Sequence, residues 1–426
     1  MFKREQLHPG VHFSCVRDEK FRHNSISINL ITPLRADRAA HTALIPSLLR
    51  KGCRSLPDFT LLEQRLCELY GASLSSDIIK VGSCHIISCG ITFVDDGYTL
   101  GGEVISDKCA ALLGDMVLQP KIQDGAFDQA DFDLERQNLI DTIEAEINDK
   151  RSYALSQCRA MLFAGSQLAT PRYGTIAAAQ AQDPHEVADW YTQLLDTAAI
   201  EILMIGCGDP APAREHFRGL FGGMSPRPAA TMAAQLPPWR GQVEERTKVI
   251  DVAQSKLVLG LRTGPLPTKQ QVDAMKLMSF LYGGTPSSRL FLNVREKLSL
   301  CYYCAARMDR ATTTLLVDIG VEHQNAGKAR EAILAQLAEL AAGSFSQQEI
   351  DETKLAVANS LRSANDSLSG LESWYLMQIL QGTALSPEEE VADMNAVTHQ
   401  QMQQAAAAVT LDSVYFLTGK EAESHE

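Results

Sequence analysis

The sequence has no apolar run that approaches the roughly 18 successive residues needed to span a bilayer. Its first residues, MFKREQLHPGVHF, also lack the apolar core and the small-residue cleavage site of a signal peptide. Dense basic runs are missing as well: 39 lysines and arginines face 52 aspartates and glutamates, which gives a net charge of -13. We therefore expect a cytoplasmic protein that binds neither nucleic acid nor a membrane surface.

Several chemical signatures are also absent. The sequence contains no G-x-S-x-G, no EF-hand loop and no dinucleotide-binding fingerprint. Its ten cysteines lie among apolar neighbours, which favours buried thiols in a reducing compartment over a disulfide framework. Cys301 and Cys304 have C-x-x-C spacing, but no second C-x-x-C exists, and in a strand such positions point to opposite faces. We therefore predict no metal or redox site there.

The length and one irregular segment predict the domain organisation. With 426 residues and 45% hydrophobic content, the chain is too long for a single core. Four prolines lie between Gly222 and Lys248, in a stretch that reads as a linker. We predict a first domain at 1–222, a linker at 223–248 and a second domain at 249–426.

The two halves repeat each other. Residues 127–143 match residues 345–361 at a constant offset of 218, with Phe127 on Phe345 and Asp133 on Asp351. Each half also shows the order strand, helix, helix, strands and long helices, followed by a further strand. In the first half these elements include 25–32, 42–51, 85–93, 102–117 with 127–164, and 199–206; in the second they include 256–263, 271–282, 312–321, 324–342 with 346–381, and 414–419. The sequence predicts a duplicated α+β fold, each half a mainly antiparallel sheet with helices on one face.

Three segments, 39–53, 127–154 and 283–303, resemble the pitrilysin/insulinase/mitochondrial-processing-peptidase family of zinc metallopeptidases, the inverzincins. In that family the first domain carries H-x-x-E-H on a helix that runs on to a Lys-Gly pair. The two histidines bind zinc from one helical face, and the glutamate deprotonates the attacking water. The resemblance implies a clamshell of two homologous domains with the fold of LuxS and the processing peptidases.

The resemblance also places the motif positions in this sequence. Alignment on Lys51-Gly52 puts the first histidine at Ala43, the glutamate at Pro46 and the second histidine at Ser47. Alanine has no donor atom, proline cannot accept a proton, and a lone serine hydroxyl is a poor zinc ligand. His41 cannot replace them, because its i+4 neighbour is Ile45; we interpret it as a helix-start or surface residue.

The third zinc ligand of the family is a glutamate on a later helix, seven residues after the glutamate of a Glu-Arg pair. Counting from Glu135 places it at Thr142, although Glu144 or Glu146 could be argued instead. Threonine at this position removes the third ligand too. We therefore expect no metal and no catalytic residue in this chain, with zinc present only in an active partner.

The second half, unlike the first, carries the motif that the family has at this place. Relatives carry R-x-x-x-x-x-x-Y in a segment written V-R-E-K-x-G-L-A-Y, and VREKLSLCY supplies Arg295 and Tyr302, with Ser299 for glycine and Cys301 for alanine. The motif context is also present, at Gly283, Gly284, Ser288, Arg289, Leu290 and Phe291. In relatives the pair reaches the peptide at the zinc, where both side chains donate hydrogen bonds. The alternative is structural: an Arg295–Glu296 salt bridge and a half-buried strand tyrosine.

Three functions follow. The first is an inactive homologue that serves as the non-catalytic subunit of a heterodimeric peptidase and contributes Arg295 and Tyr302 to peptide binding at a partner's zinc site. The second is a peptide-binding or structural assembly protein without catalysis. The third is a metallopeptidase in its own right, which would need a metal or nucleophile that the sequence does not supply. The expected partners are a peptide and either a homologous zinc-bearing subunit or a second copy of the chain.

Overall fold

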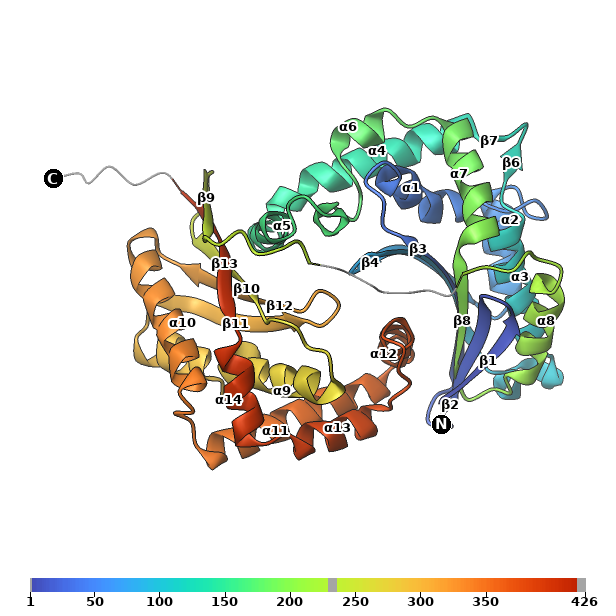
Figure 1. Cartoon of the computed structure of the whole chain (residues 1–426). Helices are drawn as coiled ribbons and strands as arrows, with labels where there is room; N and C mark the ends of the chain where they lie inside the picture. The colour runs from blue at the N-terminus through green and yellow to red at the C-terminus, as the bar shows by residue number, and fades with distance from the viewer. Residues whose placement is uncertain (1, 229–235, 420–426) are drawn as a thin grey trace. The chain divides into compact units, whose positions relative to one another are not determined.

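The computed structural model describes residues 2–228 and 236–419 (Figure 1). The chain forms two compact units. Unit 1 comprises the described residues of Met1–Glu144, Thr170–Ala233 and Asn365–Ala384, and unit 2 those of Ala145–Ala169, Ala234–Ala364 and Leu385–Glu426. Each half of the chain gives one segment to the other unit, Ala145–Ala169 to unit 2 and Asn365–Ala384 to unit 1. A linear division at 223–248 does not include this exchange of segments.

Unit 1 is built on a six-stranded sheet. Its order is β1 (Phe2–His8), β2 (Val11–Arg17), β8 (Ala199–Gly206), β3 (His23–Pro33), β5 (Cys84–Val94) and β4 (Ser73–Val81). Only β2 and β8 pair in parallel. The helices of this unit that follow in the chain are α1 (Ala39–Leu49), α2 (Phe59–Glu68), α3 (Ser106–Leu118), α4 (Gln129–Ala145), α6 (Ile176–Gln180), α7 (Pro184–Thr197) and α8 (Ala211–Phe221). A short hairpin, β6 (Ile122–Gln123) with β7 (Ala126–Phe127), precedes α4.

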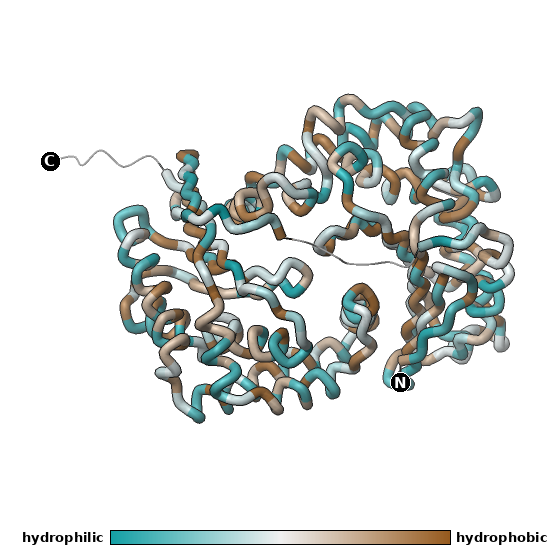
Figure 2. The backbone as a smooth tube through the Cα atoms, viewed as in Figure 1, coloured by the Kyte–Doolittle hydropathy of each residue, from teal (hydrophilic) through white to brown (hydrophobic). Residues whose placement is uncertain are grey.

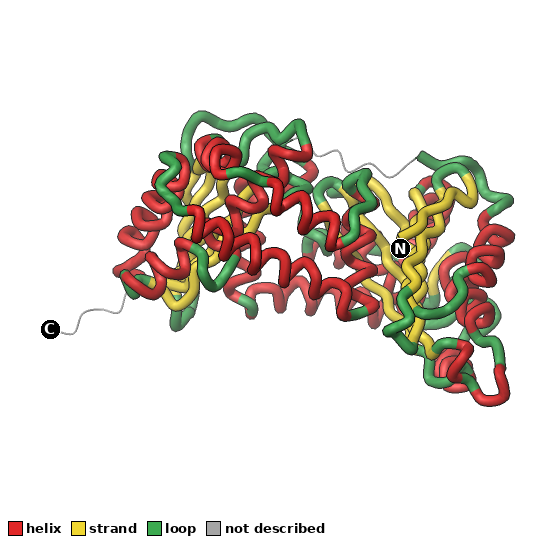
Figure 3. Tube along the Cα trace, turned by 90° about the horizontal axis from the view of Figure 1, so that it is seen from below, coloured by secondary structure: helices red, strands yellow, loops and turns green. Residues whose placement is uncertain are grey.

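Unit 2 repeats this plan with five strands. Their order is β11 (Cys301–Asp309), β12 (Thr314–Val321), β10 (Ser255–Arg262), β13 (Thr410–Thr418) and β9 (Glu244–Val249). Only β13 and β9 are parallel. Its helices are α9 (Lys269–Ser279), α10 (Ala326–Ala341), α11 (Gln347–Arg362), α13 (Pro387–Ala396) and α14 (His399–Ala407), with π-helical turns at Phe280–Gly284 and Leu290–Lys297. In both units the strands lie among helices (Figure 3). The predicted α+β fold with mainly antiparallel sheets is confirmed.

The repeat extends to the helix breaks. The starts of α4 and α11 are 218 residues apart, and the same offset separates α5 (Lys150–Leu162) from α12 (Leu368–Leu380). We predicted one helix over 127–164 and one over 346–381, which is wrong in both halves. Asp149 accepts hydrogen bonds from the amides of Arg151 and Ser152, and Ser367 accepts one from Gly370. These N-caps each start a new helix.

The helices after the breaks change units. Helix α12 packs on the sheet of unit 1, where Leu371, Tyr375 and Leu376 are buried in one cluster with strand residues such as Ile86 and Leu203. Both α12 and β8 are hydrophobic over much of their length (Figure 2). Helix α5 packs on the sheet of unit 2, so closely that a Cβ at Gly260 would clash with Leu162. Each sheet is therefore covered on both faces, and not on one face as predicted.

The predicted linker at 223–248 is only partly described, because residues 229–235 lie outside the described part of the chain. Its last residues belong to β9, which pairs with β13 over Glu244–Val249. Among the helices of residues 2–228 and 236–419, none combines the length and apolar character that crossing a bilayer requires.

Candidate functional site

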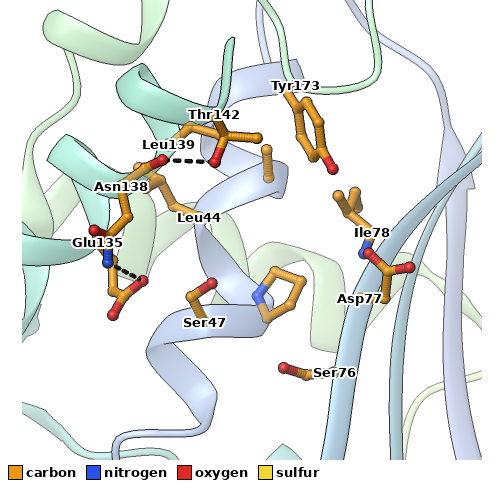
Figure 4. A pocket seen from close by; sticks show the side chains of 12 residues that line it. Leu44, Ser47, Ser76, Asp77, Ile78, Glu135, Asn138, Leu139, Thr142 and Tyr173 are labelled. Carbon is orange, nitrogen blue, oxygen red and sulfur yellow. Dashed lines mark hydrogen bonds between the residues drawn. The ribbon is translucent and has the colours of Figure 1, made fainter. Parts of the chain in front are cut away.

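One pocket of unit 1 brings together the four positions that the sequence aligned with the zinc motif. Ala43, Pro46 and Ser47 of α1 line it together with Thr142 of α4, around a volume of about 150 Å³. Positions 43 and 47 share one face of α1 because they are four residues apart. Thr142 projects from α4 onto the same space (Figure 4). The structure thus gathers the predicted residues, and their descent from zinc ligands stays a prediction.

The rest of the pocket is lined by both polar and apolar side chains and lies beside an edge strand. Ser76 and Asp77 of β4 contribute one wall, Glu135 and Asn138 of α4 another, and Tyr173 closes a side (Figure 4). Strand β4 is the last strand of its sheet order. Edge strands present backbone N–H and C=O groups that can pair with another extended chain.

The donor atoms of this pocket do not suit zinc. Its only carboxylates are Asp77 and Glu135, and no histidine or cysteine lines it. Glu135 is already engaged: its Oε1 lies 2.5 Å from Lys51 Nζ, and its Oε2 accepts a hydrogen bond from Asn138. Zinc sites in proteins need three or four imidazole, thiolate or carboxylate ligands. Within residues 2–228 and 236–419, no group of three or more such side chains could hold a metal ion.

The geometry distinguishes between the three residues considered for the third ligand. All three side chains are exposed, but Thr142 lines the pocket whereas Glu144 and Glu146 do not. The Thr142 hydroxyl donates to the carbonyl oxygen of Asn138, 2.7 Å away, one turn earlier in α4. This arrangement favours Thr142 as the counterpart of the family's third ligand.

His41 is buried, so its interpretation as a surface residue is wrong, although it does lie in the first turn of α1. Its Nε2 is 3.1 Å from Arg38 Nη1, which places a guanidinium donor against the ring. Burial lowers the pKa of His41, and the charge of Arg38 lowers it further. His41 therefore acts as a neutral acceptor at the start of the helix, away from the pocket lined by Ser47.

In unit 2, Arg295 and Tyr302 contact each other. Arg295 lies in the π-helical turn Leu290–Lys297, and its Nε donates to the main-chain oxygen of Tyr302 at 2.8 Å. The guanidinium also lies 3.2 Å from Glu296 and 4.5 Å from the centre of the Phe291 ring. The predicted salt bridge with Glu296 is thus present, beside a contact that the sequence did not suggest.

Tyr302 is 60% exposed, so its interpretation as a half-buried strand residue is wrong. The reason is a β-bulge: Cys301 pairs with Val321 and Tyr303 with Gly320, which leaves Tyr302 as an extra residue on β11. A bulged residue loses its place in the ladder, and the Arg295 guanidinium satisfies its carbonyl oxygen. The phenol reaches Glu322 at 3.4 Å and otherwise faces solvent.

The surrounding motif residues hold this region in place. Gly283 lies against β11, where a Cβ would come within 2.6 Å of the amide nitrogen of Ala306. Arg289 donates to Glu339 and Glu349 and to the main chain at Ser344. These contacts join the segment before Arg295 to α10 and α11. The motif context is therefore structural support for the Arg295 and Tyr302 positions.

Sequence reasoning missed the ion pair of the pocket and its β4 wall. Lys51 and Glu135 were used only to align the sequence with the family motif. Their opposite charges, at two positions expected beside the same site, could have predicted the ion pair. Asp77 and Tyr173 carried no signal, because they follow no motif spacing. Nor did sequence reasoning anticipate the β-bulge at Tyr302, which inserts an extra residue between Cys301 and Cys304.

Comparison with known proteins bears on the family resemblance of the chain. A family model described as "Peptidase M16 inactive domain" matches residues 183–357. Over 417 residues the chain is 28% identical to "Probable inactive metalloprotease YmfF" of Bacillus subtilis, covering 98% of both chains.

Two solved structures share the fold over the whole chain. A conserved protein from Enterococcus faecalis has a TM-score of 0.89 at 28% identity, covering 99% of this chain and 100% of that one. A protease from Helicobacter pylori has a TM-score of 0.79 at 14% identity, covering 98% and 99%. These similarities support the resemblance of the chain to inactive members of the M16 peptidase family, over part of its length for the family model and over nearly all of it for the relatives.

Proposed function

We propose that this chain is the non-catalytic subunit of a heterodimeric peptidase, in which Arg295 and Tyr302 bind the peptide at the zinc site of a homologous partner. The contrast between the two units carries the proposal. The pocket of unit 1 offers no zinc donor at Ala43 or Ser47 and no general base at Pro46, while unit 2 carries an exposed tyrosine supported by an arginine.

The chemistry of the Tyr302 region suits a peptide carbonyl. The phenol O–H is exposed, and its hydrogen bond to Glu322 is long at 3.4 Å, so exchanging that acceptor for a peptide oxygen costs little. The Arg295 guanidinium carries five N–H donors, of which Nε holds the bulge. Donors aimed at a carbonyl oxygen stabilise the negative charge that develops there during hydrolysis.

An extended peptide also matches the sheet edges. Strand β11 is the outer strand of its sheet order and carries Tyr302, and β4 is the outer strand beside the unit 1 pocket. A peptide added to such an edge gains main-chain hydrogen bonds, while side chains next to the strand select its sequence. This feature supports a peptide, and not a small metabolite, as the bound molecule.

The test is co-expression with a homologue that carries H-x-x-E-H, followed by co-purification and cleavage of a fluorogenic peptide library. We expect a complex whose cleavage rate falls roughly 10- to 100-fold with Tyr302→Phe or Arg295→Ala. Arg307→Ala is the matched control, because Arg307 is also exposed on β11. Failure to associate, or equal rates for Tyr302→Phe and Arg307→Ala, would contradict the proposal.

A peptide-binding or assembly protein without catalysis is the second candidate. The retained pocket beside β4 favours it, because that pocket needs no partner to receive a side chain. On this alternative the isolated chain binds peptides, and Ser76→Arg or Ser47→Arg weakens binding whereas Arg295→Ala does not. The two sets of variants therefore separate the candidates.

A further inference from the structure

The β-bulge at Tyr302 also changes the relation between Cys301 and Cys304. Cys301 pairs with Val321 and Cys304 with Ile319, so three steps along β11 match two steps along β12. Side chains two steps apart on a strand point to the same face. The prediction that the two cysteines point to opposite faces is therefore wrong, because Tyr302 is inserted between them.

The two thiols lie close enough that each affects the pKa of the other. Their partners Val321 and Ile319 are two steps apart on β12, a Cα separation of about 6.5 Å, which is close to the upper end of the range of about 4.4–6.8 Å that disulfides span. Closing the bond needs only a small movement, and an edge strand with a bulge is where the backbone can provide it.

The pair is also asymmetric, as dithiol redox sites are. Cys301 is partly exposed, whereas Cys304 is 5% exposed. The hydrogen bond from Cys304 lowers the pKa of Cys301, and the charge of Arg295 lowers it further, while burial raises the pKa of Cys304. A thiolate attacks best where it is accessible and stabilised by a nearby cation. Cys301 is thus the attacking thiol and Cys304 the resolving one.

We propose that Cys301 and Cys304 are a reversible dithiol–disulfide site that responds to low-molecular-weight disulfides. The Cys301 thiolate attacks one sulfur of the small disulfide, which forms a mixed disulfide and releases one small thiolate that takes up a proton. Cys304 then gives up its proton and attacks Cys301 sulfur, which releases the second small thiol. Two protein thiols are oxidised and one small disulfide is reduced to two thiols.

The site lies around a residue of the proposed peptide contact. Tyr302 stands between the cysteines, and its carbonyl oxygen is held by Arg295. A disulfide would fix the bulge and with it the direction of the phenol. This consequence rests on the proposed function, whereas formation of the bond does not.

The experiment is incubation of the full chain in oxidised glutathione, followed by alkylation, proteolysis and mass spectrometry. We expect a Cys301–Cys304 disulfide that dithiothreitol reverses. Cys304→Ser should stop at a glutathione adduct on Cys301, and Cys301→Ser should leave Cys304 unmodified. Cys67→Ser is the control, because Cys67 is exposed and is distant in the sequence from Cys301 and Cys304. Thermal unfolding checks that each variant is folded.

Two results would overturn the proposal. In the first, Cys67 of the unmodified chain is glutathionylated while Cys301 and Cys304 stay reduced. In the second, the rate of Cys304 modification in the Cys301→Ser variant equals the rate of Cys301 modification in the Cys304→Ser variant. Peptide binding by the oxidised and reduced chains is measured separately. If the disulfide forms and the partner complex does not, the proposed function fails and the dithiol site stands.

Discussion

Lys51 Nζ and Glu135 Oε1 lie 2.5 Å apart and join the segment that follows α1 to the middle of α4. The side chains are only 22% and 11% exposed. These are the two segments that bring Ser47 and Thr142 to one pocket. The ion pair therefore holds together the walls of a site that has no metal ligands to do so.

Replacing Lys51 with Met should destabilise the chain by about 1–2 kcal/mol, because Glu135 loses its cation in a mostly buried position. The change is measured as the Tm of unit 1, determined by calorimetry. Arg65→Met is the control: its ion pair with Glu68 is more exposed and should contribute less than about 0.5 kcal/mol. Equal changes in Tm for the two variants would contradict this role for Lys51.

Restoring the motif should restore zinc. The quadruple variant Ala43→His, Pro46→Glu, Ser47→His and Thr142→Glu places two imidazoles and two carboxylates in one pocket, and should bind about one zinc per chain. The triple variant that keeps Thr142 tests the third ligand. We expect it to bind zinc at least about 10-fold more weakly, as measured by calorimetric titration.

Equal zinc affinity of the triple and quadruple variants would instead assign the third ligand to Glu144 or Glu146. No binding by either folded variant would mean that the pocket is not a former zinc site. Calorimetric unfolding of each variant establishes that it is folded, since the substitutions add charge beside Glu135.

Ser299 adopts a φ of 51°, in the left-handed region that favours glycine, and the motif that this segment resembles has glycine at this position. Ser299→Gly should therefore stabilise unit 2 by about 1 kcal/mol, through relief of backbone strain before β11. Ser360→Gly, an exposed position inside α11, is the control and should destabilise it by about 0.5–1 kcal/mol. Thermal unfolding measures both; a loss of stability in Ser299→Gly would refute the strain.

His85 predicts a dependence of stability on pH. It is 1% exposed on β5, its Nε2 lies 2.9 Å from the carbonyl oxygen of Arg172, and burial lowers its pKa from 6.5 to about 4. Because the folded chain keeps the ring neutral, its contribution is fully present above pH 6.5 and is lost as the pH falls through 4. The loss should amount to about 3 kcal/mol.

The measurement for His85 is the change in Tm between pH 7 and pH 4. His85→Gln keeps a hydrogen-bond donor without a titrating ring, so its Tm should fall less than that of the unmodified chain. His23→Gln changes an exposed histidine and serves as the control. An identical acid response of His85→Gln and the unmodified chain would exclude His85 as the source.

Much of the fold was predictable because its central strands are apolar. All of β8, AIEILMIG, is buried, and the sequence placed it at 199–206, where the structure has it. The outer strands β1 and β9 were missed, since FKREQLH and EERTKV are mostly exposed and are held by backbone pairing with β2 and β13. Charged residues on such edges prevent aggregation and remove the hydrophobic pattern.

Only those residues of the site that follow the spacing of a family motif could be predicted from the sequence. Ala43, Pro46, Ser47 and Thr142 were aligned with family positions, and they do line one pocket. The bulge at Tyr302 could not be read from CYYC, because inserting one residue into a ladder leaves no compositional signal. The helix breaks at Asp149 and Ser367 each depend on one capping side chain in an otherwise helical segment.

The most direct test of the account is the zinc content and peptidase activity of the purified chain, measured by elemental analysis and with a fluorogenic peptide library. We predict zinc far below one equivalent and no cleavage that EDTA abolishes, because the pocket at Ser47 and Thr142 lacks ligands. One equivalent of zinc together with EDTA-sensitive cleavage by the isolated chain would contradict the account.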